Sequence, residues 1–278
     1  MRSLKNVMAD KRTTPARPDL AASSLKGQVE AARFVDGEQA AVGWGRISLR
    51  AGPSHDTAQV SELLFGETVT IYERKDGWAW LQAKTDSYMG YVRESGLSAA
   101  FDADARAIHL LTPLLSAPEV KSPLRDLLPL NARVRRGQQE GNFVAVADGF
   151  VAARALAPVE SAASDFVAVA EQFVGVPYVW GGKTFQGLDC SGLIQTSLQA
   201  AGAPCPRDTD MMESALGHPV TRDQIKRGDL VFWKGHMGVM RDAVTLLHAN
   251  AYFMQVTSEP LDTAIARITT PVTSIKRL

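Results

Sequence analysis

Three residues of this chain, Cys190, His236 and His248, have the side chains and the order that nucleophilic thiol catalysis requires: a nucleophile, then a base, then an orienting group. Cys190 follows a glycine-rich turn and opens a segment with helical spacing of its apolar residues. At a helix N-terminus, free N–H groups and the helix dipole stabilise a thiolate and lower its pKa. The backbone N–H of Cys190 is also expected to hold a developing oxyanion.

The same three residues are possible zinc ligands, but their spacings lack the short paired clusters of structural zinc sites. A cysteine between Asp189 and Ser191 at a helix start is better explained as a nucleophile, so we expect no metal ion and no cofactor. The second cysteine, Cys205, lies between two prolines. Low cysteine content suits a reducing compartment, and we expect no disulfide bond.

Length and composition limit the class of protein. A chain of 278 residues exceeds the common single-domain range, and 45% hydrophobic residues support folded cores. The formal net charge is zero, so we expect no nucleic-acid partner. There is no apolar run of about 18 residues, and the polar N-terminal stretch lacks a signal-peptide core. We therefore expect a cytoplasmic monomer without a membrane span.

Changes of pattern divide the chain into four segments. Residues 1–40 are polar and charged, and we expect a leader that is partly disordered, or weakly helical over residues 19–32. Short β-rich runs separated by Gly, Pro and Asp turns predict two small all-β barrels, at residues 41–100 and 101–158. Three landmarks recur in the same order at a period of about 60 residues, which indicates a tandem repeat.

The fourth segment, residues 159–278, combines helices with later strands. Helical spacing predicts one helix over residues 164–174 with Ser164 as its N-cap, and a second from the cysteine to a stop at Gly202. Apolar runs then predict strands, over residues 228–233, 237–240, 245–249 and 265–268. Helices followed by antiparallel strands are typical of an α+β domain.

Five ordered motifs in the fourth segment resemble the NlpC-type cysteine peptidases, a family of bacterial, papain-like cell-wall peptidases. The motifs are residues 176–182, 188–193, 206–209, 227–233 and 235–239. The two β-rich units resemble bacterial SH3-like barrels. The combination is similar to the γ-D-glutamyl-L-diamino acid endopeptidases of the family. The resemblance implies a papain-like α+β domain preceded by two SH3-like barrels.

The resemblance also implies roles for individual residues. Cys190 is the expected nucleophile, and His236 the base that forms a thiolate–imidazolium pair with it and later protonates the leaving amine. His248 is expected to fix the tautomer of His236. Tyr178 matches the cleft tyrosine of the family, whose hydroxyl is expected to help hold the oxyanion.

Further residues match positions that contact substrate in the family. Asp189, Ser191 and Thr209 correspond to positions that line the substrate cleft, although Asp189 can equally be only a helix N-cap. In the subgroup, the first barrel caps one end of the cleft. Glu62 and Tyr88 are the residues available there to capture a free peptide amine, because a buried ammonium needs an anionic partner.

We therefore expect a cysteine peptidase that hydrolyses the γ-D-glutamyl–diamino acid bond of murein peptides with free N-terminal L-alanine, in cell-wall peptide recycling. Three alternatives stay open. The first is an exported or phage-type hydrolase of intact peptidoglycan, acting as an endopeptidase or an amidase. The second is a non-catalytic wall-binding module, and the third is an acyl transferase that hands the thioester to amines.

Overall fold

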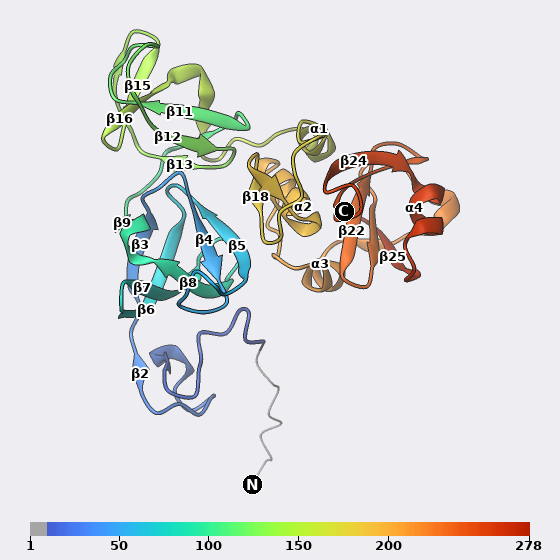
Figure 1. The fold of residues 1–278 in the computed structure, drawn as a ribbon, viewed down its shortest axis with the longest axis horizontal. Coiled ribbons are helices and arrows are strands. Elements are labelled where there is room, and N and C mark those ends of the chain that lie inside the picture. The colour runs from blue at the N-terminus through green and yellow to red at the C-terminus, as the bar shows by residue number, and fades with distance from the viewer. Residues whose placement is uncertain (1–9) are drawn as a thin grey trace.

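The computed structural model describes residues 10–278 and forms two all-β barrels followed by an α+β domain (Figure 1). This architecture confirms the predicted fold class. The part of the expected leader at residues 1–9 lies outside the described residues. No helix in the described part of the chain is long and apolar enough to cross a membrane.

Residues 10–37, the N-terminal segment, differ from the disordered or weakly helical leader that the sequence suggested. They contain one parallel pair of short strands and one 3-10 turn: β1 (Ala21–Ala22), β2 (Phe34–Val35) and η1 (Ser23–Leu25). Leu20 is fully buried and packs with Trp80 and Met89 of the first barrel. This burial overrides the weak helical tendency of the segment, because packing routinely outweighs propensity.

The first barrel is a seven-stranded sheet in the order β5-β4-β8-β7-β6-β3-β9. Its elements are β3 (Glu38–Val42), β4 (Arg46–Arg50), β5 (Gln59–Leu64), β6 (Thr68–Lys75), β7 (Trp78–Ala83), β8 (Met89–Arg93), η2 (Glu94–Gly96) and β9 (Leu97–Ala99). Asp76 and Gly77 both have positive φ at the β6–β7 hairpin, the turn geometry that an Asp-Gly pair favours. The barrel core contains Leu49, Leu63 and Leu81.

The second barrel repeats the plan of the first with two sheets, ordered β13-β10-β17 and β12-β11-β16-β15-β14. Its elements are β10 (Ala105–Ala107), β11 (Leu111–Leu115), β12 (Leu124–Pro129), β13 (Arg133–Val134), β14 (Arg136–Glu140), β15 (Phe143–Val146), β16 (Gly149–Ala152), η3 (Ala153–Ala155) and β17 (Leu156–Pro158). The β7–β8–η2–β9 run of the first barrel corresponds to β15–β16–η3–β17, the elements that carry the repeated landmarks.

The α+β domain contains one six-stranded antiparallel sheet in the order β20-β25-β21-β22-β23-β24. Its elements are α1 (Phe166–Glu171), β18 (Lys183–Thr184), β19 (Gly187–Leu188), α2 (Cys190–Ala200), α3 (Thr209–Ala215), β20 (His218–Pro219), η4 (Arg222–Gln224), β21 (Leu230–Trp233), β22 (His236–Met240), β23 (Thr245–Asn250), β24 (Gln255–Pro260), α4 (Leu261–Arg267) and β25 (Val272–Arg277). Gly202 has a φ of 76° just after α2, as expected of a helix stop.

Two local predictions for this domain are wrong. The strand predicted over residues 265–268 is the end of α4, where Leu261 and Ala264 are buried three residues apart on one helix face. The N-cap of α1 is Asp165 and not Ser164, because the Asp165 carboxylate accepts hydrogen bonds from the N–H groups of Val167 and Ala168.

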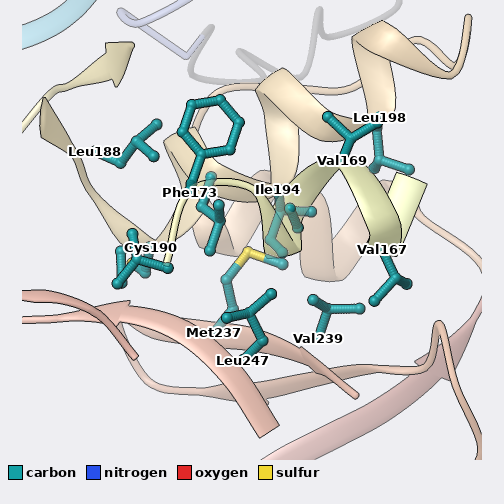
Figure 2. Close-up of a cluster of buried hydrophobic side chains, with 14 of the residues drawn as sticks. Val167, Val169, Phe173, Leu188, Cys190, Ile194, Leu198, Met237, Val239 and Leu247 are labelled. Carbon is teal, nitrogen blue, oxygen red and sulfur yellow. The ribbon is translucent and has the colours of Figure 1, made fainter. Parts of the chain in front are cut away.

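The sheet separates two apolar cores, and the larger one fixes the cysteine helix. Helices α1 and α2 pack on one face of the sheet, whereas α4 covers the opposite face (Figure 1). Figure 2 shows Phe173 and Ile194 from the helical side meeting Met237 and Leu247 from the strands. Cys190 lies at the edge of this cluster, so packing of α2 on β22 and β23 sets the position of the thiol.

Candidate active site

The thiol of Cys190 stands at the first residue of α2, as the sequence predicts. Asp189 is the N-cap, and its carboxylate accepts from the N–H of Gly192 at 2.7 Å and from the N–H of Gly181 at 2.8 Å. The first N–H groups of a helix have no intrahelical acceptor. The N–H of Cys190 therefore has no acceptor within the helix, and its role as oxyanion donor stays a prediction.

A buried arginine fixes the residues on both sides of the cysteine. Arg207 donates to Asp189 Oδ2 at 2.7 Å and to Ser191 Oγ at 2.7 Å. It also donates from Nε to Ser61 of β5 at 3.0 Å, which ties the first barrel to the cysteine helix. Asp189 and Ser191 line the cleft, but these bonds turn their polar atoms toward the protein. Contact of either side chain with substrate stays a prediction.

Two histidines and a glutamate form a row across three neighbouring strands. His236 begins β22, and its Nε2 lies 2.9 Å from Nδ1 of His248 on β23. The Nε2 of His248 lies 2.9 Å from Oε1 of Glu259 on β24. Glu259 also forms an ion pair with Arg267 at the end of α4. The antiparallel order β22-β23-β24 brings these residues together.

The row assigns one tautomer to each ring. Because the Glu259 carboxylate only accepts, the proton of His248 lies on Nε2, and its Nδ1 accepts in turn. His236 must then donate from Nε2, which leaves its Nδ1 as the basic nitrogen. The predicted orienting role of His248 fits this arrangement.

The thiol is held between the helix and the strand that carries the base. Met237, next to His236, packs in the same apolar cluster as Cys190, and its main chain acts to lower the pKa of the thiol. Thr209 Oγ1 lies 3.7 Å from the sulfur. Thr209 thus contacts the nucleophile, in the cleft region where the sequence analysis placed it.

Burial opposes ionisation of both partners. Burial, with a smaller contribution from the Asp189 charge, raises the pKa of Cys190 to about 11. Burial lowers the pKa of His236 to about 3 and that of His248 to about 4. The predicted lowering of the thiol pKa is therefore wrong for this resting site. Desolvation is the largest contribution to both pKa shifts, and these shifts favour a neutral thiol and a neutral imidazole at rest.

A cleft of about 330 Å³ opens beside the sulfur, where the N-terminal segment, the first barrel and the α+β domain meet. Its lining includes Val60 and Tyr88 of the first barrel and Trp180, Cys190 and Thr209 of the α+β domain. The first barrel therefore forms one wall of the cleft that contains the nucleophile.

The polar end of the cleft carries an acidic residue that the sequence analysis did not single out. The hydroxyl of Tyr88 donates to Asp208 Oδ2 at 2.8 Å, and Asp210 lies in the same lining. Burial and the Asp208 charge raise the pKa of Tyr88 well above its ordinary value, so the phenol keeps its proton. Tyr88 lies in the cleft region predicted to capture an amine, and Asp208 supplies the negative charge there.

Glu62 has partners in the structure other than the peptide amine expected from the sequence. Its Oε2 accepts from the N–H of Lys183 at 2.8 Å, and its Oε1 pairs with Arg46 at 2.5 Å. Glu62 is buried and does not line the cleft, because its carboxylate joins the first barrel to β18. Both oxygens already have partners outside the cleft, and amine capture by Glu62 stays a prediction.

Tyr178 is half-buried and lies near the nucleophile. Burial and the negative charge of Asp189 raise the pKa of its phenol. The predicted contribution of its hydroxyl to the oxyanion site stays a prediction.

Several site residues lacked a signal in the sequence. Glu259 and Arg267 complete the histidine row from a strand and a helix that carry no recognisable motif.

Cys190 and Cys205 are both free thiols. Within residues 10–278, no group of three or more His, Cys, Asp or Glu side chains is arranged to hold a metal ion.

Two known protein families match parts of this chain. Residues 175–271 match the NlpC/P60 family, and residues 49–97 match the bacterial dipeptidyl-peptidase SH3 domain. A crystal structure of an NlpC/P60 family protein from Bacillus cereus superposes with a TM-score of 0.73 over 86% of this chain and 99% of that chain. Its sequence identity is 18%, so this likeness shows a shared fold.

Two relatives extend the comparison in sequence. Dipeptidyl-peptidase 6 of Lysinibacillus sphaericus is 32% identical over 34% of this chain and 35% of its own length. Gamma-D-glutamyl-L-lysine dipeptidyl-peptidase of Bacillus subtilis is 26% identical over 72% of this chain and 75% of its own length. Residues 175–271, with the cysteine helix and the histidine row, thus belong to the NlpC/P60 family and follow a bacterial SH3 domain of the dipeptidyl-peptidase kind.

Proposed function

We propose that the protein is a cysteine peptidase that hydrolyses the γ-D-glutamyl–diamino acid bond of murein peptides with a free N-terminal L-alanine. One observation carries the proposal: Cys190 and the Tyr88–Asp208 pair line the same cleft. A peptide bound there has its reacting carbonyl at the sulfur and its amino group near the carboxylate. The name of the Bacillus subtilis relative, gamma-D-glutamyl-L-lysine dipeptidyl-peptidase, supports this choice of bond.

The chemistry follows from the neutral resting pair. As the sulfur of Cys190 attacks the carbonyl carbon, Nδ1 of His236 takes the thiol proton, so charge develops only during attack. The N–H of Cys190 and the Tyr178 hydroxyl stabilise the oxyanion. His236 then protonates the leaving amine. Water, deprotonated by the same nitrogen, hydrolyses the thioester and frees the thiol.

The acidic end of the cleft supports selection for an amine. Asp208 and Asp210 place two carboxylates within the lining, whereas a neutral N-acyl group would desolvate them without neutralising their charge. A positively charged peptide N-terminus is therefore the complementary ligand. The position of the Tyr88–Asp208 pair relative to Cys190 sets how far that amine lies from the cleaved bond.

Mass-spectrometric product analysis with L-Ala-γ-D-Glu-diaminopimelate, its N-acetylated form and whole sacculi tests the proposal. We expect cleavage of the free-amine peptide into L-Ala-D-Glu and the diamino acid. Cys190→Ala should abolish turnover, whereas Cys205→Ala, which changes a thiol outside the cleft, should retain it. Cleavage of sacculi alone would replace the proposal with a hydrolase of intact wall, and no cleavage by the wild type would reject it.

We further propose that the enzyme acts in cytoplasmic peptide recycling, because a free N-terminal L-alanine is present on released peptides and absent from peptides linked to glycan. We also propose that it is a monomer. Cell fractionation with an antibody against the chain tests the compartment, and detection in the extracellular fraction alone would reject it. Sedimentation analysis tests the oligomeric state.

A further inference from the structure

The N-terminal segment inserts an arginine into the acidic end of the cleft. Arg12 Nη1 donates to Asp208 Oδ2 and to Asp210 Oδ1, both at 2.8 Å, and Nη2 donates to Asp210 Oδ2 at 2.8 Å. Asp10 pairs with the same guanidinium at 2.7 Å. Arg12 is itself part of the cleft lining, together with Tyr88 and Cys190.

The main chain around Arg12 is fastened to the first barrel. The N–H of Met89 donates to the carbonyl of Arg12 at 2.7 Å, and Gln82 Nε2 donates to the carbonyl of Thr13 at 2.8 Å. Farther along the segment, Arg17 stacks on Trp80 and Leu20 is fully buried. The guanidinium is thus presented by an anchored piece of chain.

Arg12 does not neutralise all of the negative charge at this end of the cleft. Three carboxylates, those of Asp10, Asp208 and Asp210, surround a single guanidinium. Asp208 accepts from both Arg12 and Tyr88 through Oδ2. No hydrogen bond from residues 10–278 to its Oδ1 is present, so that oxygen remains for a ligand. The local charge stays negative, and one ammonium group is still attracted.

We propose that Arg12 is a specificity-determining residue that closes the amine end of the cleft. It holds Asp208 and Asp210 for one ammonium group and blocks the path of any chain that continues beyond it. A peptide with an N-acyl group or an extra residue must displace a guanidinium bound to three carboxylates. This inference rests on the proposed peptidase function, and it explains how a cleft wall admits only a peptide that begins there.

The test compares wild type, Arg12→Ala and Arg12→Lys on L-Ala-γ-D-Glu-diaminopimelate, its N-acetylated form and its N-glycyl form. Arg33→Ala is the matched control, since Arg33 lies in the same segment and pairs with Glu73 of the barrel, away from the cleft. We expect Arg12→Ala to lower the ratio of kcat/KM for the free-amine peptide to that for the blocked peptides by about tenfold or more. Arg12→Lys keeps the positive charge but loses the planar set of guanidinium donors, and its ratio of kcat/KM values should lie between those of the wild type and Arg12→Ala. Arg33→Ala should match the wild type.

A binding measurement separates selectivity from chemistry. In a Cys190→Ala background, calorimetric titration of the free-amine and N-acetylated peptides should show the same loss of discrimination after Arg12→Ala. A thermal melt and the fluorescence of Trp80 report whether the segment stays docked. Loss of discrimination with the segment docked supports the proposal, whereas loss that accompanies detachment and also follows Leu20→Ala overturns it in favour of a purely structural role.

The remaining outcomes distinguish the inference from the proposed function. If the wild type cleaves free-amine and blocked peptides equally, the peptidase stands and the role of Arg12 is rejected. An unchanged ratio in Arg12→Ala also rejects it. A large gain in rate on the free-amine peptide, with selectivity intact, would identify Arg12 as an inhibitory plug instead. If the wild type cleaves no peptide, the proposed function fails and the inference fails with it.

Discussion

The Nδ1 atom of His248 lies 2.9 Å from Nε2 of His236, and this contact decides which nitrogen of His236 is the base. His248 is itself fully buried and directed by Glu259, so the orienting group of this site is a histidine with a carboxylate behind it. In this site a neutral imidazole, and not a carboxylate, contacts the catalytic histidine His236 directly. A neutral imidazole stabilises an imidazolium less than a negative charge does, and Glu259 restores that charge one residue farther away.

Replacement of His248 tests this tautomer control. His248→Ala should lower kcat by about 10²-fold or more with little change in KM, because His236 loses the acceptor that keeps its Nδ1 unprotonated. His248→Asn should recover part of the rate, since an amide oxygen can accept from Nε2 of His236. Steady-state kinetics on the free-amine peptide measures both. Equal loss in the two variants would assign His248 a packing role only.

Local signals explain the part of the site that the sequence predicted. The cysteine follows an N-cap aspartate and precedes an apolar helix, and His236 and His248 stand in short apolar strands. Both kinds of element are recognisable within about ten residues of sequence. The positions of the nucleophile, the base and the orienting residue could therefore be predicted before their spatial arrangement was known.

Contacts between distant segments explain the errors. Arg12 and Asp208 are 196 positions apart in the sequence, so no local sequence pattern predicts their ion pair. Glu62 was expected in the cleft, but a buried glutamate on a barrel strand can pair with any element packed against it, and here it binds β18. The predicted direction of the Cys190 pKa shift was also wrong, because burial of the thiol in the apolar cluster is a property of the folded domain.

The pH dependence of alkylation tests the neutral resting pair. Because burial raises the pKa of Cys190 to about 11, its alkylation by iodoacetamide should keep accelerating from pH 7 through pH 9 without reaching a plateau. Peptide mapping distinguishes Cys190 from Cys205, and Cys190→Ala provides the blank. A plateau below pH 7 would show a preformed thiolate and would contradict the resting state described here.

The stability of the fold should fall as the pH drops from about 6.5 to 4. Burial lowers the pKa of His248 to about 4 in the folded protein, whereas the unfolded chain takes up the proton near 6.5. The unfolded state therefore binds more protons in this window, and the free energy of unfolding decreases there by up to about 1.4 kcal/mol per pH unit for this residue. Chemical denaturation across pH 4–7 should show a shallower slope for His248→Asn than for wild type. His109→Asn, at an exposed position, serves as the control and should keep the wild-type slope. Identical slopes in all three proteins would contradict the neutral buried state of His248.

Asp208 should govern recognition of the amine without governing the chemistry. Its carboxylate accepts a hydrogen bond from the Tyr88 hydroxyl at 2.8 Å and lines the cleft, whereas the sulfur of Cys190 lies 3.7 Å from Thr209 Oγ1. Asp208→Asn keeps the shape and the hydrogen bond from Tyr88 but removes the charge. We expect KM for the free-amine peptide to rise by about 10-fold to 100-fold, the usual loss for a charged hydrogen bond, with kcat changed far less. Tyr88→Phe should have a smaller effect, because it removes only the donor that orients the carboxylate. An unchanged KM in Asp208→Asn would mean that the amine binds elsewhere, whereas a loss confined to kcat would place Asp208 in the positioning of Cys190 and remove it from amine recognition.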